Sequence, residues 1–481
     1  MEQLRDLGKA IVIGGGIAGL MTARVFSVFF EEVLIVDKDE FPLHPADRPG
    51  LPHGFHPHRF TFRGKMITEQ LFPGYEEALK ALGSPSSFNK SVYMMNQHGV
   101  VSGTYERNDI KFSRAALEYV IRERVKAIPH VRILPAHDVL HLMMNADRTA
   151  VTGVQIRNRM TKSHVEIKAD FVADTSGRGS KLPQWLKDAG YEVPSPDRLK
   201  AAIGYSTRRY QVPAHLNHII EKWDVINIMG QPQNNTFTGV FSFIENQVAE
   251  LLLYRPGGHF PPTDAEGFEQ AVGGLPTPMI AEIVRDLEPI TSPRGFRVPE
   301  LYRHHYEQME KWPSGLLVLG DAFCIYDPIF GQGMTVAAAE ADILNACLQE
   351  HRNNPQPQFE QRLLRKMQDE VITPAWWLNC AADLQWKNVE YEAAAEPLKG
   401  VDFARRFMDL VLKEGTANSN GELFGLYWAV NSLSAPLQQL FNPQTVRTVL
   451  EASEEGRQLL EELLDEHQLP LEDVLNHIIP G

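Results

Sequence analysis

Three glycines near the N-terminus limit what this chain can fold into. Gly14-x-Gly16-x-x-Gly19 follows the short apolar run 9–13 and precedes apolar residues at helical spacing over 17–25. This pattern predicts a strand, a tight turn and a helix. Glycines at these positions allow the turn itself, the close approach of backbone to a pyrophosphate, and close packing of the helix.

A carboxylate completes this first unit. The apolar run 33–36 closes on Asp37, about twenty residues after the glycines, where a side chain can hydrogen-bond the hydroxyls of a ribose. Together these segments predict a βαβ unit that binds a dinucleotide, although the motif alone does not separate FAD from NAD. The residues of this unit that we predict to bind the cofactor are Gly14, Gly16, Ala18, Gly19, Asp37 and Lys38.

Further strand and helix patterns follow the first unit. The segment 41–58 is dense in Pro, Gly and His, which predicts a loop. Ser113 is placed as the N-cap of a helix over 113–127. The β-like segments are 132–134, 151–158, 167–173 and 315–319, and the last of them leads into a helix predicted over 333–348.

The second half of the chain divides into a β-rich and a helical part. The segments 240–244 and 250–254 predict a β-rich insertion within 201–254. From about residue 355 onward the pattern is mainly helical, with breaks predicted at Pro397, Gly415 and Pro443.

Charge and cysteine content narrow the class of protein. The chain has 481 residues, which favours two or three domains, and its net charge of −14 repels nucleic acid. Three cysteines without Cys-x-x-Cys spacing favour a reducing, cytoplasmic setting. No run reaches the roughly 18 to 20 apolar residues of a membrane span, and residues 1–6 contain no apolar leader. Peripheral contact with a lipid surface is kept as an alternative.

Later motifs decide between the dinucleotides by resemblance. One segment resembles the second FAD fingerprint of the single-component, group A flavoprotein monooxygenases, and its matching residues are Gly320, Asp321, Ala322, Pro328, Gly331, Gly333 and Met334. The stretch from Asp174 to Ser180 is similar to the Asp-Gly motif of those enzymes, and Arg114 resembles the helix-borne arginine that they place near the FAD phosphates.

The second fingerprint also has a physical rationale. Asp321 at a strand end can accept a hydroxyl of the ribityl chain. Gly331 and Gly333 leave backbone N–H groups free at a helix N-terminus, where the partial positive charge favours an anion such as the reduced flavin ring.

A closer likeness extends over most of the chain, to the bacterial flavin epoxidases and hydroxylases of natural-product pathways, which are distantly related to squalene monooxygenase. The matching segments are Arg48 to Gly54 with His56 and His58, Leu71 to Gly74, Trp185-Leu186, and Gly331 to Ala338. Phe55, Pro57 and the pair Tyr326-Asp327 depart from the pattern of that group.

The resemblance implies an α/β fold with three parts. A Rossmann-type, glutathione-reductase-like FAD domain is predicted from 1–80, 105–200 and 295–350. A β-sheet substrate domain is interleaved with it, from 81–104 and 201–294, and 351–481 form a helical C-terminal region.

The implied reaction is the transfer of one oxygen atom from O₂ to an alkene or activated ring of a small apolar substrate. NADPH or NADH would bind transiently and reduce FAD, and a flavin C4a-hydroperoxide would carry the oxygen. Because such a transfer needs no protein nucleophile, we assign no catalytic base. The aromatic residues of the C-terminal third are predicted to form core, with the wall of an apolar substrate pocket as the alternative.

Several alternatives remain. A flavin halogenase would share the fold, but its expected Trp-x-Trp-x-Ile-Pro motif is absent from the sequence. A reductase of the geranylgeranyl-reductase type and a non-enzymatic flavin-binding protein are the others. His44, His53, His56 and His58 have spacing that suits a metal, but no cysteine joins them, so we predict no metal and a loop that covers flavin or substrate.

Overall fold

A parallel sheet of five strands organises the N-terminal half of the protein. The structure is a computed structural model that describes residues 7–481, so the prediction for residues 1–6 lies outside the described part. The strand order is β18-β9-β1-β2-β5, and all four pairings are parallel. The strands are β1 Leu7–Ile13, β2 Phe30–Val36, β5 Val131–Leu134, β9 Phe171–Asp174 and β18 Leu316–Val318.

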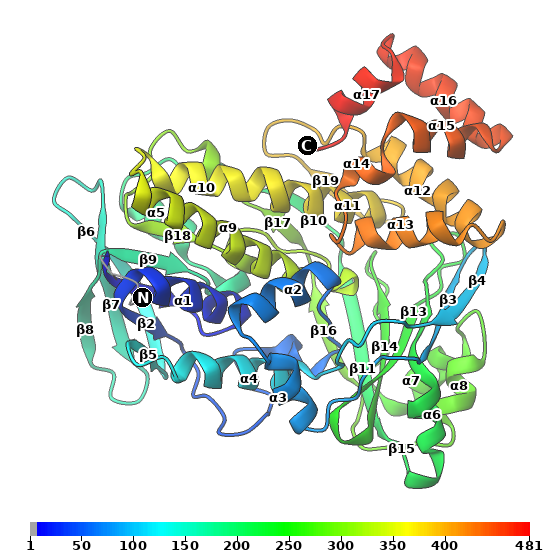
Figure 1. Ribbon diagram of the computed structural model, residues 1–481, viewed down its shortest axis with the longest axis horizontal. Helices are drawn as coiled ribbons and strands as arrows, with labels where there is room; N and C mark the ends of the chain where they lie inside the picture. The colour runs from blue at the N-terminus through cyan, green and yellow to red at the C-terminus, as the bar shows by residue number, and fades with distance from the viewer. Residues whose placement is uncertain (1–6) are drawn as a thin grey trace.

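Helices cover this sheet. α1 Ile17–Phe29 and α9 Gly333–Asn353 pack side by side against it, as Figure 1 shows in blue and yellow-green. α4 Arg114–Lys126 begins as predicted at Ser113, whose Oγ accepts a hydrogen bond from the Ala116 N–H at 3.1 Å. The other helices of this half are α2 Phe62–Leu71, α3 Tyr75–Ala81, α5 Leu182–Asp188 and α10 Phe359–Met367.

Two boundaries differ from the sequence predictions. α9 continues to Asn353 rather than ending near 348, because its last five residues are polar and the apolar pattern stops one turn before the helix does. The single strand predicted over 167–173 is two strands, β8 His164–Lys168 and β9. β8 pairs in the antiparallel sheet β6-β7-β8 and is mostly exposed, so apolar alternation does not mark it. The sequence did not predict β6 His137–Met144, whereas β7 Val151–Asn158 has the expected bounds.

A mostly antiparallel sheet of eight strands forms the other half of the molecule. Its main order is β15-β11-β14-β13-β12-β3-β4, with β16 on β11. Its strands are β3 Ser91–Asn96, β4 Gly99–Thr104, β11 Ile203–Gln211, β12 Trp223–Ile228, β13 Thr238–Ile244, β14 Val248–Arg255, β15 Glu288–Pro289 and β16 Arg294–Val298. The strands predicted at 240–244 and 250–254 are therefore present. β3 and β4 join this sheet from far upstream in the sequence.

The two faces of this sheet belong to two hydrophobic clusters. Along β14, Leu252 and Tyr254 join the main core of the protein, whereas Leu251 and Leu253 point to a second cluster. The second cluster is closed by short helices, among them α7 Ala265–Gly273 with its fully buried Phe268. The neighbouring helices are α6 Asn217–Lys222 and α8 Met279–Val284. Each face of the sheet is thus buried against a different layer.

The C-terminal part is mainly helical, as predicted. Figure 1 shows it in orange and red above one end of the large sheet, close to the hairpin β3–β4. A π-helical turn over 368–372 joins α10 to the first helix of this part, and a small sheet β17-β10-β19 lies beside it. The elements are α11 Thr373–Asp383, α12 Val401–Thr416, α13 Gly421–Asn431, α14 Leu437–Leu440, α15 Pro443–Glu451, α16 Glu454–His467, α17 Leu471–Ile478, β10 Asp197–Lys200, β17 Leu301–Arg303 and β19 Glu390–Glu392.

Two predicted helix breaks in this part are confirmed. Gly415 is the second-last residue of α12, which ends at Thr416, and a Cβ there would lie 3.1 Å from the backbone of Phe424 on α13. The glycine therefore lets the two helices approach closely next to the break. Pro443 stands at the first turn of α15 as predicted.

The C-terminal aromatic residues are mostly core. Trp376 and Trp377 on α11 are at most 1% exposed, which fits the predicted packing role. None of the helices described between residues 7 and 481 is both long enough and apolar enough to cross a membrane.

We predict that the second cluster contributes its own share of stability. Phe268→Ala removes a fully buried ring and should lower the free energy of unfolding by about 3 to 5 kcal/mol in urea titrations followed by tryptophan fluorescence. Phe88→Ala removes a ring that is 52% exposed and should change it by less than about 0.5 kcal/mol. Equal effects of the two substitutions would show that α7 is not packed as described.

Candidate flavin site

Four parallel strands end at the same edge of the N-terminal sheet. Ile13 at the end of β1 pairs with Val36 on one side and Asp174 on the other, and Asp174 pairs with Val318. The turns that follow these strands therefore lie together at the carboxyl edge, where open α/β sheets bind their ligands. This register brings together the predicted residues Gly14, Asp37, Asp174 and Gly320.

The glycines of the first turn are required by close packing. Gly14 has a φ of +102°, and a Cβ there would lie 2.7 Å from the Thr175 carbonyl oxygen. A Cβ on Gly19 would overlap the carbonyl of Gly14. Thr175 closes the contact between the turns, because its Oγ1 donates to the Ile13 carbonyl at 2.8 Å.

The N-terminus of α1 is left open. Gly16 is its N-cap and gives no side-chain hydrogen bond, and the first turn has no acidic residue. A Cβ on Gly16 would find nothing nearer than 4.0 Å, and Ala18 in the same turn faces Gly320. Free N–H groups at the positive end of a helix, with open space before them, suit a phosphate.

Asp37 is tied to the glycine turn. Its Oδ2 accepts a hydrogen bond from the Gly15 N–H at 2.6 Å, and its Oδ1 accepts one from the Asp39 N–H at 2.8 Å. Burial raises the pKa of Asp37, although Arg48 nearby and the two N–H groups oppose that rise. The carboxylate is held at the end of β2, facing the turn after β1.

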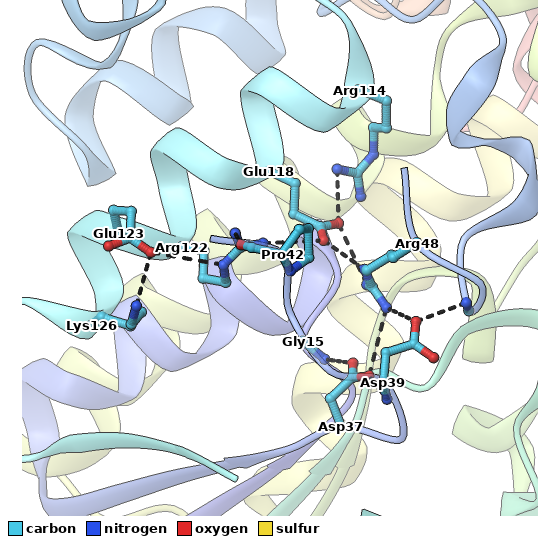
Figure 2. A network of polar contacts seen from close by, with 11 residues as sticks. Gly15, Asp37, Asp39, Pro42, Arg48, Arg114, Glu118, Arg122, Glu123 and Lys126 are labelled. Carbon is cyan, nitrogen blue, oxygen red and sulfur yellow. Dashed lines mark hydrogen bonds and ion pairs between the residues drawn. The ribbon is translucent and has the colours of Figure 1, made fainter. Parts of the chain in front are cut away.

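A buried network of ion pairs links this carboxylate to α4 (Figure 2). Arg48 donates from Nη1 to Asp39 at 2.6 Å and from Nε to Glu118 at 2.7 Å. Glu118 also pairs with Arg114 at 3.0 Å and with Arg122 at 3.8 Å, one turn away on either side of α4. The loop that carries Arg48 is thereby joined to the helix and to the strand end.

The charges of the network balance. Its acidic members are Asp37, Asp39 and Glu118, and its basic members are Arg48, Arg114 and Arg122. Burial opposes the charge of Glu118, but Arg114, Arg48 and Arg122 outweigh it and hold its pKa below the usual value.

Arg114 keeps capacity for one more partner. Its Nη1 is buried and has no well-aligned hydrogen-bond acceptor among residues 7–481, although Glu118 lies 3.0 Å away. Burial lowers its pKa, with Glu118 opposing. A buried guanidinium nitrogen without an acceptor is costly unless an anion completes it. With the open N-terminus of α1, this nitrogen fits the pyrophosphate of FAD.

The second fingerprint faces the same space. Asp321 has no hydrogen-bond donor in the described part of the chain, and burial raises its pKa while Arg178 and Arg114 oppose the rise. Gly331 adopts a φ of +64°, and Gly333 begins α9 with no side-chain cap and no acid in the first turn. A Cβ on Gly333 would meet nothing within 4 Å. This helix end also suits a negative group.

A buried glutamate supports the second turn from behind. Glu340 on α9 is fully buried, and its Oε2 accepts a hydrogen bond from the Gly320 N–H at 2.6 Å. Its other oxygen has no partner in the described chain. Burial raises the pKa of Glu340 to about 8, with only the Gly320 N–H opposing, so it holds a proton at neutral pH.

Four predicted residues lie at the site's margin or are engaged within their own turn. Lys38 and Pro328 are exposed, and Met334 is half-buried against the main core. The Asp174 carboxylate accepts hydrogen bonds from the Ser176 N–H at 3.0 Å and from the hydroxyls of Ser176 and Ser180. Asp174 therefore shapes the turn that follows β9.

The histidine loop packs under this site. His56 Nδ1 lies 2.7 Å from Thr207 Oγ1, and its ring meets Tyr205 edge-on. Burial lowers the pKa of His53, His56 and His58 to about 3, so they are neutral at physiological pH. His44 is exposed. Within residues 7–481 no group of three or more His, Cys, Asp or Glu side chains is arranged to hold a metal.

Sequence reasoning missed the residue at the centre of the network. Glu118 belongs to the helix motif that contains Arg114 but receives no role of its own there, although Arg114, Glu118 and Arg122 are spaced four residues apart, a spacing that places alternating charges on one helix face. No sequence pattern marks Glu340 as a buried residue, because a single acidic residue in an apolar helix is also typical of a solvent-exposed position.

Two comparisons with known sequences find similarity to this chain. Residues 297–369 match the family model of squalene epoxidase. Over 399 residues the chain is 29% identical to Protein Rv3254 of Mycobacterium tuberculosis, covering 81% of this chain and 82% of that protein.

Solved structures show the same fold. The flavin-dependent brominase Bmp2 is 12% identical, with a TM-score of 0.62 over 95% of this chain and 98% of that chain. PqsL of Pseudomonas aeruginosa, described as a probable FAD-dependent monooxygenase, is 14% identical, with a TM-score of 0.56 over 87% of this chain and 99% of that chain. The predicted fold class is confirmed, and the family match and fold together support an oxidoreductase.

The network predicts a large effect at Glu118. Glu118→Gln leaves buried arginines without their shared carboxylate and should lower the free energy of unfolding by about 3 to 5 kcal/mol in urea titrations. The matched control is Glu123→Gln on the same helix, because Glu123 is half-exposed, pairs with the exposed Lys126 at 3.0 Å and lies as far as 3.9 Å from Arg122; it should cost less than about 1 kcal/mol. Similar losses for both variants would contradict a central role for Glu118.

Glu340 predicts a dependence of stability on pH. Its pKa is raised in the folded state, so the stabilising proton is present at low pH and is lost as pH rises toward about 8. From pH 5 to 8 the wild type should lose stability relative to Glu340→Gln, at up to about 1.4 kcal/mol per pH unit in denaturant titrations. Glu350→Gln, on the exposed side of α9, should run parallel to the wild type. A parallel course for Glu340→Gln would instead show that Glu340 is ionised.

Proposed function

We propose that the protein is an FAD-dependent monooxygenase that transfers one oxygen atom from O₂ to a small apolar organic substrate, by epoxidation or hydroxylation. The observation that carries the proposal is the pair of helix N-termini without side-chain caps, α1 and α9, together with the buried Arg114, whose Nη1 pairs with Glu118 but has no well-aligned acceptor in the described chain. The match to squalene epoxidase over 297–369 supports the reaction class.

The cofactor-binding residues are assigned to two ends of one FAD molecule. The N–H groups beside Gly16 and the guanidinium of Arg114 bind the pyrophosphate, and Asp37 binds the adenosine ribose. Asp321 accepts a ribityl hydroxyl, and the N-terminus of α9 at Gly333 stabilises the negative edge of the ring. Bound FAD supplies the redox and oxygen chemistry, and the chain positions it and excludes water.

The proposal assigns no general base to the chain. His56 is buried and His53 and His58 are half-buried, and a pKa lowered to about 3 leaves all three neutral, so they add no charge near the site. NADPH or NADH is proposed to bind transiently as the reductant. The apolar nature of the substrate rests on the resemblance to natural-product epoxidases. Trp428 on α13 is a candidate contact, since its half-buried indole N–H has no acceptor in the described chain.

Two other reactions fit the same fold. A halogenase is favoured by the likeness to Bmp2, but the sequence contains no Trp-x-Trp-x-Ile-Pro. A reductase would use the same cradle without oxygen transfer. We also propose a reducing, cytoplasmic setting, which is compatible with three free cysteines, two of them buried.

Mixing the reduced protein with oxygen tests the function. The purified protein should be yellow, and NADPH or NADH should bleach it without air. On mixing with O₂ and candidate apolar alkenes in a stopped-flow instrument, we expect a transient absorbance that neither oxidised nor reduced flavin gives, followed by an oxygenated product. Direct return to oxidised flavin with a reduced substrate would instead identify a reductase. A product that forms only with halide would identify a halogenase.

A further inference from the structure

Two acidic side chains meet in the core behind the second fingerprint. Asp327 precedes the turn to Gly331 and is fully buried, and Asp383 at the end of α11 is 1% exposed. Their carboxyl groups lie close enough to form a hydrogen bond when one of them carries a proton. No Arg, Lys or His of residues 7–481 forms an ion pair with either of them. Two carboxylates in contact inside a protein do not both stay ionised, because their repulsion is barely screened there.

The contacts around the pair identify what is missing. Tyr254 on β14 donates its hydroxyl to Asp327 Oδ2, and the Ile329 N–H donates to Asp327 Oδ1 at 3.0 Å. Asp327 therefore has the acceptor role of an ionised carboxylate. Asp383 Oδ2 is buried without any donor in the described chain. A proton on Asp383, donated to Asp327, supplies the partner that the pair lacks.

Helix α11 also holds both ends of the segment from Asp327 to Gln332. Asn379 lies one turn before Asp383 on α11, and its Oδ1 accepts a hydrogen bond from the Asp327 N–H at 2.7 Å. Its Nδ2 donates to Gln332 Oε1 at 2.6 Å, and Gln332 Nε2 donates to the Asn431 carbonyl at 2.6 Å. The segment from Asp327 to Gln332 is thus fixed from the C-terminal helices, immediately before Gly333 begins α9.

We propose that Asp327 and Asp383 share one proton, and that this pair positions the turn at Gly331 for the ring of the flavin. The second clause rests on the proposed function, whereas the sharing of the proton does not. Loss of the proton would put two negative charges behind the turn. They would repel each other and also the negative charge that the ring gains on reduction.

In the described part of the chain, no cation near Asp327 and Asp383 would stabilise a second negative charge on the pair. The other titratable groups that act on it are Tyr254 on β14, Tyr205 on β11 and Cys380 on α11, and none of them is a cation. Burial raises the pKa of both carboxyls. The stabilising proton is therefore present at low pH and is lost as pH rises.

Asparagine variants test the shared proton. In Asp383→Asn an amide N–H can donate to Asp327 where the proton did, so the contact survives without titrating. From about pH 5 to 8, the unfolding equilibrium constant of the wild type should rise relative to that of Asp383→Asn, by up to about tenfold per pH unit for as long as the folded protein keeps the proton. Asp342→Asn, an exposed position on α9, should follow the wild type.

A constant ratio between wild type and Asp383→Asn across this range overturns the shared proton. If Asp383→Asn does not fold, Asp327→Asn provides the same comparison, because it places the amide on the other partner. The unfolding measurement needs no flavin. If the protein binds no FAD, the proposed function is refuted, but the unfolding curves still decide whether the two carboxyls share a proton.

The flavin potential tests the positioning role. In the FAD-loaded protein, the midpoint potential of the wild type should fall more steeply with rising pH than that of Asp383→Asn, since the second charge opposes reduction. Coincident potential profiles, together with a pH-dependent unfolding ratio, would keep the shared proton but overturn its role toward the ring.

Discussion

Glu118 is the acceptor on which the candidate site depends, because three arginines converge on its single buried carboxylate. One of them, Arg48, comes from the loop after β2 and also binds Asp39, so the loop, the strand end and α4 are held together by one set of charges. Such a network is stable only while every member is paired. It leaves Arg114 buried, with its Nη1 3.0 Å from Glu118 but without a well-aligned acceptor in the described chain.

The rest of the site combines helix N–H donors that have no side-chain partner in the described chain with acidic side chains that are buried and hydrogen-bonded. α1, whose N-cap is Gly16, and α9, which begins at Gly333, both lack a side-chain cap, so their first N–H groups stay available, as expected where a ligand carries the negative charge. The acids nearby are held in the interior: Glu340 is protonated against Gly320, and Asp327 is bound to Tyr254 and Asp383. The protons proposed on Glu340 and on the aspartate pair thus reduce the negative charge near the place where reduced flavin would add more.

The sequence predicts most of the N-terminal sheet because its motifs are local. Gly14, Gly16 and Gly19 mark a turn that only glycine fits, and the N-cap Ser113 marks the start of α4. The polar pairs are not predictable in this way, since Asp327 meets Asp383 and Gln332 meets Asn379 only after the C-terminal helices fold back. The close approach at Gly415 is likewise not predictable, because its neighbour Phe424 belongs to another helix.

A crystal structure of the protein purified with FAD would test the central assignment most directly. We expect the pyrophosphate oxygens to lie within hydrogen-bond distance of Arg114 Nη1 and the N–H groups beside Gly16, with the ring next to Gly331 and Gly333. Flavin bound elsewhere, or a pyrophosphate that does not contact Arg114, would contradict the assignment of this sheet edge as the cofactor site.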